Sequence, residues 1–234
     1  MKPAFYALRP GGRRDYVTLL HVPYTLWHLS YVAIGAGLAA RLDGPRLVET
    51  FVAFFLAMGI GAHALDELNG RPLRTGIPAT VLAVIAGISI AAAMAMGLVD
   101  GGLRLLPFVV AGAVLVCGYN LELLGGVLHS DVWFGLAWGA FPVLVGAYAQ
   151  HWTLPLPALV AALFAFFLSM GQRSLSTPAR ALRRRIAAVS VHVTWHDGSE
   201  QELGRADLLA PLERALRYFT WATGTLAVAL VLAR

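Results

Sequence analysis

The sequence predicts an all-α membrane protein with about seven transmembrane helices and one polar loop that carries a short β-hairpin, because its composition is strongly apolar and its apolar runs are long. Of its 234 residues, 58% are apolar and only 13% are charged, whereas a soluble domain has about 45–50% apolar and about 25% charged residues. The mean hydropathy is +0.68. A soluble monomer of this composition would expose larger apolar patches than monomers tolerate.

Seven apolar runs, each long enough to cross a hydrocarbon core about 30 Å thick, are separated by polar breaks. We interpret them as the transmembrane helices of a single integral membrane domain that covers residues 1–234. Their expected bounds are 17–41, 48–67, 76–98, 104–124, 131–151, 153–171 and 214–233. An odd number of spans places the two termini on opposite sides of the membrane.

The distribution of basic residues predicts that the N-terminus is cytoplasmic. With that orientation, 14 of the 18 Lys and Arg residues lie on the cytoplasmic side, as the positive-inside rule requires. The formal net charge of +5 is therefore explained by membrane orientation, and we expect no nucleic-acid partner. Membrane lipid is the expected surrounding.

The one long polar segment, residues 172–213, is predicted to form a cytoplasmic cap. It begins with the basic stretch PARALRRR (178–185), which we expect to lie on anionic lipid head groups. The alternating stretch that follows, centred on Asp197 and Gly198, predicts a β-hairpin with a primed turn. Because an isolated hairpin is marginally stable, we expect it to pack over the cytoplasmic mouth of the bundle.

Ionisable side chains within the predicted spans are the main functional candidates, because burying them in a membrane is costly. In the predicted orientation they converge on the cytoplasmic half of the bilayer. His63, Asp66 and Glu67 share one helical face through their i, i+3 and i+4 spacing. The other candidates are His28, Glu122 and His129. His21, near a helix start, is expected to be an interfacial residue without a ligand role.

Two arginines, Arg71 and Arg74, follow the acidic cluster on either side of Pro72 and Leu73. A guanidinium group is a planar donor suited to phosphate or carboxylate. The positive-inside bias alone would equally explain two arginines at this position. The sequence leaves both interpretations open.

The segment HALDELNGRPLRTGIP (63–78) resembles the second helix and following turn of the UbiA superfamily of intramembrane prenyltransferases. The segments GYNLELLGG and DVWFGLAWGAFPVLVGAYA are similar to that family's tyrosine-containing helix end and its Gly-punctuated next helix. The likeness covers residues 17–170. It implies transfer of a prenyl group from a prenyl diphosphate with magnesium as cofactor, with Asp66, Glu67 and Arg71 as catalytic residues. Arg71, Arg74, Tyr119 and Asn120 would bind the substrate.

The chain departs from the family pattern after the sixth span, where a second acidic motif should follow. It has GQRSLSTPARALRRR there, and no carboxylate occurs between Asp131 and Asp197. Mixed histidine and carboxylate ligands suit iron, manganese or zinc better than magnesium. A transition-metal enzyme that acts on a hydrophobic substrate is therefore an alternative, with the ligands His28, His63, Asp66, Glu67, Glu122 and His129. A transporter or binding protein is a second alternative.

Overall fold

The computed structural model describes residues 2–234, and 73% of the chain is helical. Five helical segments are long and apolar enough to cross a membrane, which supports an integral membrane protein. The prediction of a mainly helical chain with one short hairpin is confirmed, whereas the number of spans stays a prediction. The five segments are α3–η1–α4 (Gly44–Leu68), α5–η2 (Ala79–Arg104), α7–η4–α8 (Asp131–His151), α9 (Leu156–Arg184) and α10 (Arg205–Leu232).

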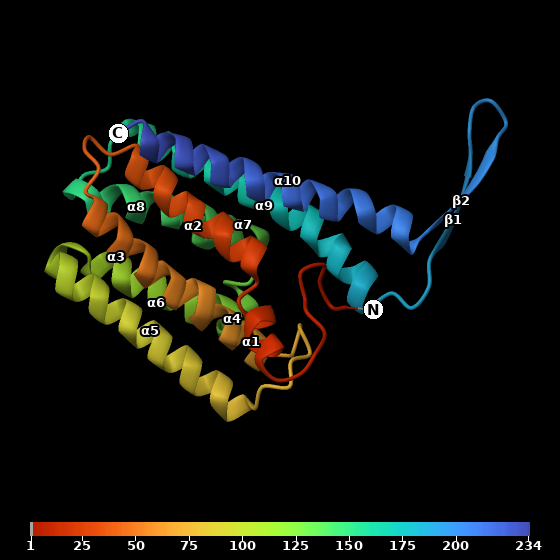
Figure 1. Cartoon of the computed structure of the whole chain (residues 1–234), viewed down its shortest axis with the longest axis horizontal. Helices are drawn as coiled ribbons and strands as arrows, with labels where there is room; N and C mark the ends of the chain where they lie inside the picture. Colours follow the sequence, from red (N-terminus) through yellow and green to blue (C-terminus); the bar gives the residue numbers. More distant parts are fainter. Residues whose placement is uncertain (1) are drawn as a thin grey trace.

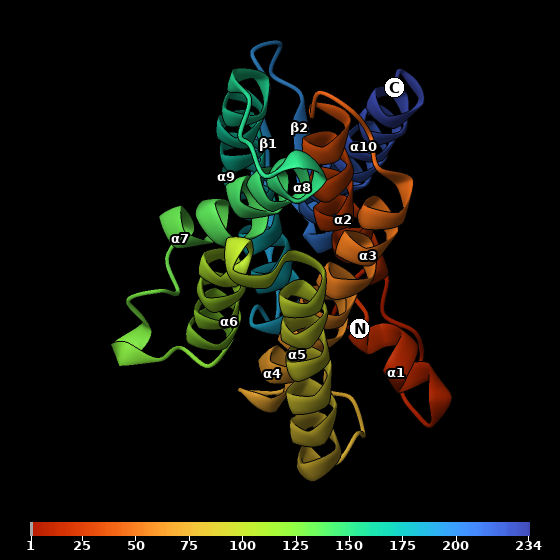
Figure 2. The ribbon, with the colours of Figure 1, turned by 90° about the vertical axis from the view of Figure 1, so that its left-hand side faces the viewer.

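Three shorter helices complete the bundle. They are α1 (Arg13–Leu19), α2 (Val22–Gly37) and α6 (Leu106–Asn120). In Figure 2, α2 and α8 (Phe141–His151) lie between α9 and α10, with α5 and α6 on the other side of the bundle. The bundle therefore has a central helix pair, α2 and α8, with other helices packed around it.

Glycine allows α2 and α8 to approach at backbone distance. A Cβ atom on Gly35 would lie 2.0 Å from the backbone oxygen of Val143, and one on Gly146 would lie 2.2 Å from that of Val32. Small residues at such crossings are typical of helices that pack closely in lipid. This pair fixes the position of α2, which carries His28 and begins directly after His21.

Two segments of π-helix interrupt the long helices. They are η1 (Phe55–Ala62), between α3 (Gly44–Phe54) and α4 (His63–Leu68), and η4 (Leu136–Ala140), between α7 (Asp131–Gly135) and α8. A π-segment has an extra residue in its helical turn, which rotates the side chains that follow about the helix axis. Such segments often occur at functional sites. Both segments border the cavities described below.

The hairpin pairs β1 (Ser190–Thr194) with β2 (Glu200–Gly204) in antiparallel register, with Ser190 opposite Gly204. Its turn differs from the predicted primed turn. Trp195 accepts a hydrogen bond from Gly198, and of the loop residues only Gly198 has a positive φ, of 83°. A primed type I′ turn needs positive φ at two successive residues, so this is a three-residue loop with a left-handed glycine.

The hairpin also does not cover the bundle. Figure 1 shows β1 and β2 projecting away from the helices beyond the ends of α9 and α10. The side chains of both strands are exposed or half-buried, so the hairpin does not pack on the bundle. The predicted cap is therefore wrong in its placement, because α9 continues as a helix 13 residues beyond the predicted end of its span at residue 171 and carries the hairpin outward.

Candidate functional site

A polar cavity lies at one end of the bundle, between α2, α4, α6, α9 and the N-terminal residues 3–6. The space between its walls measures about 950 Å³, including volume that is open to solvent. Titratable and polar side chains dominate its wall. They are Tyr6, His21, Tyr24, His28, His63, Asp66, Tyr119, Asn120, His129, Gln172, Ser176, Arg180, Arg183, Arg184 and Glu213.

Three histidines of the cavity are oriented in the same way by the backbone. The Nδ1 atom of His28 lies 2.7 Å from the Trp138 carbonyl oxygen, and those of His63 and His129 lie 3.0 Å from the carbonyl oxygens of Gly59 and Tyr119. A carbonyl oxygen only accepts, so each Nδ1 carries the proton and donates it. The Nε2 atoms have no protein partner within residues 2–234, and in the neutral ring each of them is an acceptor.

His21 also belongs to this cavity, contrary to its expected interfacial place. Its side chain is buried, and its ring stacks on that of His63 with centroids 4.1 Å apart. The Tyr6 hydroxyl is hydrogen-bonded to its Nδ1 at 2.9 Å, and the tautomer of His21 sets which of the two groups donates. Burial, the largest influence, raises the pKa of Tyr6 well above its usual value, so the hydroxyl is neutral. An N-terminal residue thus closes over a histidine that the sequence assigned to the membrane surface.

The two neighbouring acidic residues have different surroundings. Asp66 lines the cavity and interacts electrostatically with Arg180 and Arg184. Glu67 is fully buried outside the cavity, and its oxygens accept hydrogen bonds from the backbone N–H of Leu73 and of Thr75, each at 2.8 Å. The predicted metal and catalytic role of Glu67 does not fit this position, because the chain turns back after α4 and surrounds its carboxylate.

The two predicted phosphate-binding arginines point elsewhere. Arg71 and Arg74 do not line the cavity, and both have positive φ values, 54° and 55°, in the turn after α4. Arg71 donates a 2.5 Å hydrogen bond to the carbonyl oxygen of Ile77, within its own loop, and Arg74 is exposed. The predicted catalytic and substrate-binding roles therefore lack the required geometry.

The remaining predicted residues come from the end of α6 and the loop after it. Tyr119 and Asn120 line the cavity as predicted for substrate contacts, and the Tyr119 hydroxyl accepts a hydrogen bond from Arg173. Glu122 is exposed, has a positive φ of 51° and lies outside the cavity. Its nearest carboxylate oxygen is 4.0 Å from Nδ1 of His129. Glu122 thus approaches His129 from outside and does not line the cavity with it.

The basic groups of the cavity come instead from α9, where the sequence predicted only head-group contacts. Arg180, Arg183 and Arg184 are spaced i, i+3 and i+4, which places them on one helical face. Arg183 forms an ion pair with Glu213 of α10, whereas Arg184 donates to the carbonyl oxygen of Pro3 at 3.0 Å. Neither Arg180 nor Arg184 has an ion-pair partner among the described residues. The i, i+3, i+4 spacing in PARALRRR was the sequence signal for this face.

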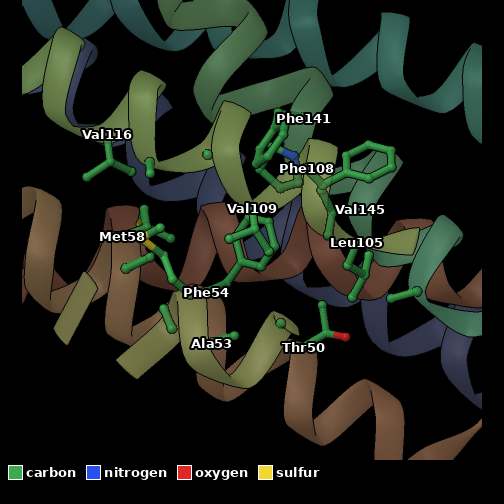
Figure 3. Close-up of a pocket in the computed structure, with 18 of the residues that line it drawn as sticks. Thr50, Ala53, Phe54, Met58, Leu105, Phe108, Val109, Val116, Phe141 and Val145 are labelled. Atoms are coloured by element: carbon green, nitrogen blue, oxygen red, sulfur yellow. The ribbon is translucent and has the colours of Figure 1, made fainter. Parts of the chain in front are cut away.

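A second, apolar cavity adjoins the polar one. It encloses about 1,060 Å³ and is lined almost entirely by apolar side chains of α3, α5, α6 and α8. Figure 3 shows Phe54, Phe108 and Phe141 pointing toward one another along its length. Met58 and Trp138 line both cavities. These two side chains therefore form a wall that the two spaces share.

The donor set of the polar cavity does not fit a magnesium diphosphate site. Magnesium prefers several carboxylates, phosphates and waters, but Asp66 is the one cavity carboxylate without an arginine pair in residues 2–234, since Glu213 pairs with Arg183. In the same range no group of three or more His, Cys, Asp or Glu side chains is placed to hold a metal ion. The histidines are thus near one another without forming a closed ligand set.

Comparison of the chain with protein-family models, with curated proteins and with solved structures gives no significant match.

Proposed function

We propose that the protein is an integral membrane enzyme that binds a prenyl diphosphate and transfers its prenyl group. The observation that carries this proposal is that a polar, arginine-containing cavity and an apolar cavity share a wall at Met58 and Trp138. An amphiphile with an anionic head and a long hydrocarbon tail matches this pair of spaces. In this proposal the bundle has seven spans, a UbiA-like arrangement and a cytoplasmic N-terminus.

Arg180 and Arg184 are the proposed ligands of the diphosphate. Both line the polar cavity and have no acidic ion-pair partner in the described chain. Guanidinium groups bind phosphate oxygens through paired, charge-assisted hydrogen bonds. Arg183 contributes less, because Glu213 neutralises its charge.

The same two arginines would assist cleavage of the bond between the prenyl group and the diphosphate. Negative charge develops on the leaving diphosphate as this bond breaks, and prepositioned cations stabilise that charge. The tail, held between the aromatic side chains of the apolar cavity, would keep the reacting carbon near Met58 and Trp138. No step of this proposal passes through a magnesium ion, because the cavity lacks the carboxylates to hold one.

A transition-metal enzyme remains a second candidate because of the three oriented histidines. Histidines that bind metals commonly donate one ring N–H to a backbone carbonyl, as His28, His63 and His129 do. This candidate predicts that purified protein carries iron, manganese or zinc and loses it in His63→Asn. Elemental analysis showing equal metal content in the wild type and in that variant would eliminate this ligand set.

The proposed function is tested by binding of geranylgeranyl diphosphate to the full chain in lipid nanodiscs. Arg180→Ala and Arg184→Ala should each weaken binding about 10- to 100-fold, because each removes hydrogen bonds to a charged group. Arg185→Ala is the matched control, since Arg185 is exposed, adjacent in sequence and outside the cavity. Arg74→Ala is a second control from the other basic segment.

Turnover is followed in the same samples as release of diphosphate and as prenylated product detected by mass spectrometry after addition of membrane lipid extract. Equal affinity in all four variants, or no binding by the wild type, would contradict the proposed function.

A further inference from the structure

The innermost part of the polar cavity is defined by α2 and α9. The Ser169 hydroxyl donates a 3.3 Å hydrogen bond to the Tyr31 hydroxyl, which fixes the level at which the two helices meet. His28 lies one turn from Tyr31 and Gln172 lies about one turn from Ser169, each in the direction of the cavity that both residues line. His28 and Gln172 are therefore at a similar depth.

His28 and Gln172 lie at the level where the polar and apolar cavities adjoin. His28 donates from Nδ1 to the carbonyl oxygen of Trp138, whose side chain borders both spaces. A ligand group held by His28 would consequently lie where the polar head meets the apolar tail.

Gln172 has a buried amide without a partner. Its side chain is 2% exposed, and its Oε1 atom accepts no hydrogen bond within residues 2–234. Nor does its Nε2 donate to any described residue. Leaving a buried amide unpaired is unfavourable, and such groups in native proteins call for a specific explanation. A ligand that bonds to this amide supplies one.

His28 requires a ligand group that can donate a hydrogen bond. Its Nδ1–H is already used, so its Nε2 offers only a lone pair to the cavity and needs a donor. A hydroxyl group donates one hydrogen bond and accepts others, whereas a diphosphate at neutral pH offers almost only acceptors. A hydroxyl group can therefore donate to Nε2 of His28 and accept from the Nε2–H of Gln172, whereas a diphosphate has no proton to donate to His28.

We infer that His28 and Gln172 form a binding site for the hydroxyl group of an uncharged, lipid-like alcohol, separate from the arginine site for the anionic head. The inference rests on the proposed function in that this alcohol would be a second ligand, next to the prenyl diphosphate. The hydroxyl donates to Nε2 of His28 and is oriented by the Gln172 amide.

The test compares the binding of geranylgeraniol and of its methyl ether to the full chain in lipid nanodiscs. The two probes share the hydrocarbon tail, but the ether has no proton to donate to His28. We expect the wild type to bind the alcohol about tenfold more tightly than the ether, the effect of about one neutral hydrogen bond. Equal affinity for the two probes would overturn the inference.

Two variants test whether the preference for the alcohol over the ether depends on His28 and Gln172. His28→Asn keeps an amide N–H for the Trp138 carbonyl and removes the Nε2 acceptor, and Gln172→Leu removes the unpaired amide. Both should reduce the preference for the alcohol to less than about twofold. Because Gln172→Leu replaces an unsatisfied polar group, it should unfold at the same temperature as the wild type or higher. A full preference retained in both variants would overturn the inference.

Matched controls come from similar residues outside the cavity. His151, at the other end of the molecule, also bonds to a backbone carbonyl, that of Arg41, and Ser174 is exposed on α9. His151→Asn and Ser174→Ala should leave the preference unchanged.

The two proposals fail separately. If Arg180→Ala and Arg184→Ala weaken binding of the diphosphate while the alcohol is not preferred, the inference fails and the proposed function stands. If the alcohol preference depends on His28 and Gln172 while no diphosphate binds, the proposed function fails and the hydroxyl site stands.

Discussion

Two basic segments of this chain, the loop 69–76 and the last turns of α9, contain arginines that look equally suited to phosphate, but they have different surroundings. In the loop, Arg71 bonds to carbonyl oxygens of its own segment, and Arg74 faces outward. On α9, Arg180 and Arg184 line a cavity that also contains Asp66 and four histidines. Only the second segment places cationic groups where a ligand can reach them.

The difference shows how much the local backbone decides. A loop has many unpaired carbonyl and N–H groups, which its own side chains satisfy first, as Arg71 and Glu67 do. On α9, Arg180 donates to the Thr177 hydroxyl one turn back and Arg184 donates to the Pro3 carbonyl oxygen, and both arginines still line the cavity. The helical arginines are therefore the ones available to a ligand.

Removing both helical arginines should cause the largest loss of affinity for the diphosphate. Arg180→Ala combined with Arg184→Ala should weaken geranylgeranyl diphosphate binding at least about 100-fold, because two sets of charge-assisted hydrogen bonds are lost. The affinity is measured in nanodiscs beside the double variant Arg71→Ala with Arg74→Ala. A larger loss in the loop variant would reverse the comparison between the segments.

The next largest effect is a difference in thermal stability between variants of the adjacent residues Asp66 and Glu67. Glu67→Ala should lower stability by about 3 kcal/mol, because it leaves the N–H groups of Leu73 and Thr75 without their buried acceptor. Asp66→Ala, in the cavity, should change thermal stability far less and alter diphosphate binding instead. Thermal unfolding of both variants in detergent provides the measurement, and equal unfolding temperatures would count against a structural role for Glu67.

A smaller effect concerns the apolar cavity. A Cβ atom on Gly112 would lie 3.3 Å from the Phe141 ring, so Gly112→Leu should partly fill this cavity. Binding of geranylgeranyl diphosphate should weaken about tenfold, since contacts along the tail are lost. Dimethylallyl diphosphate, which has a much shorter tail, is the control ligand and should bind with unchanged affinity. Equal losses for both ligands would show that the tail does not occupy this cavity.

The smallest expected effect concerns the metal ion. Because arginines supply the positive charge in the proposed site, EDTA should change diphosphate binding by less than about twofold. Titration before and after chelation is the measurement. Complete loss of binding with EDTA and its recovery with magnesium would restore the metal-dependent interpretation.

The sequence by itself determined that the chain is mainly helical and that several of its helices are apolar and long enough to cross a membrane. Composition and the length of the apolar runs predict helices that span a bilayer, because these properties depend on residue type rather than on partners. The sequence also predicted that ionisable groups converge on one end of the bundle. Glu67 and Glu122 lie outside the cavity at that end, which is lined by His28, His63, Asp66, Tyr119, Asn120 and His129.

Only the tertiary structure decided which polar groups face the cavity. The neighbours Asp66 and Glu67 are indistinguishable by composition, yet the returning loop surrounds one and leaves the other free. The arginines of α9 reach the cavity because the helix continues beyond its apolar part, and His21 is buried because the N-terminal Tyr6 packs over it. These outcomes depend on contacts between segments far apart in the chain, which residue spacing alone does not specify.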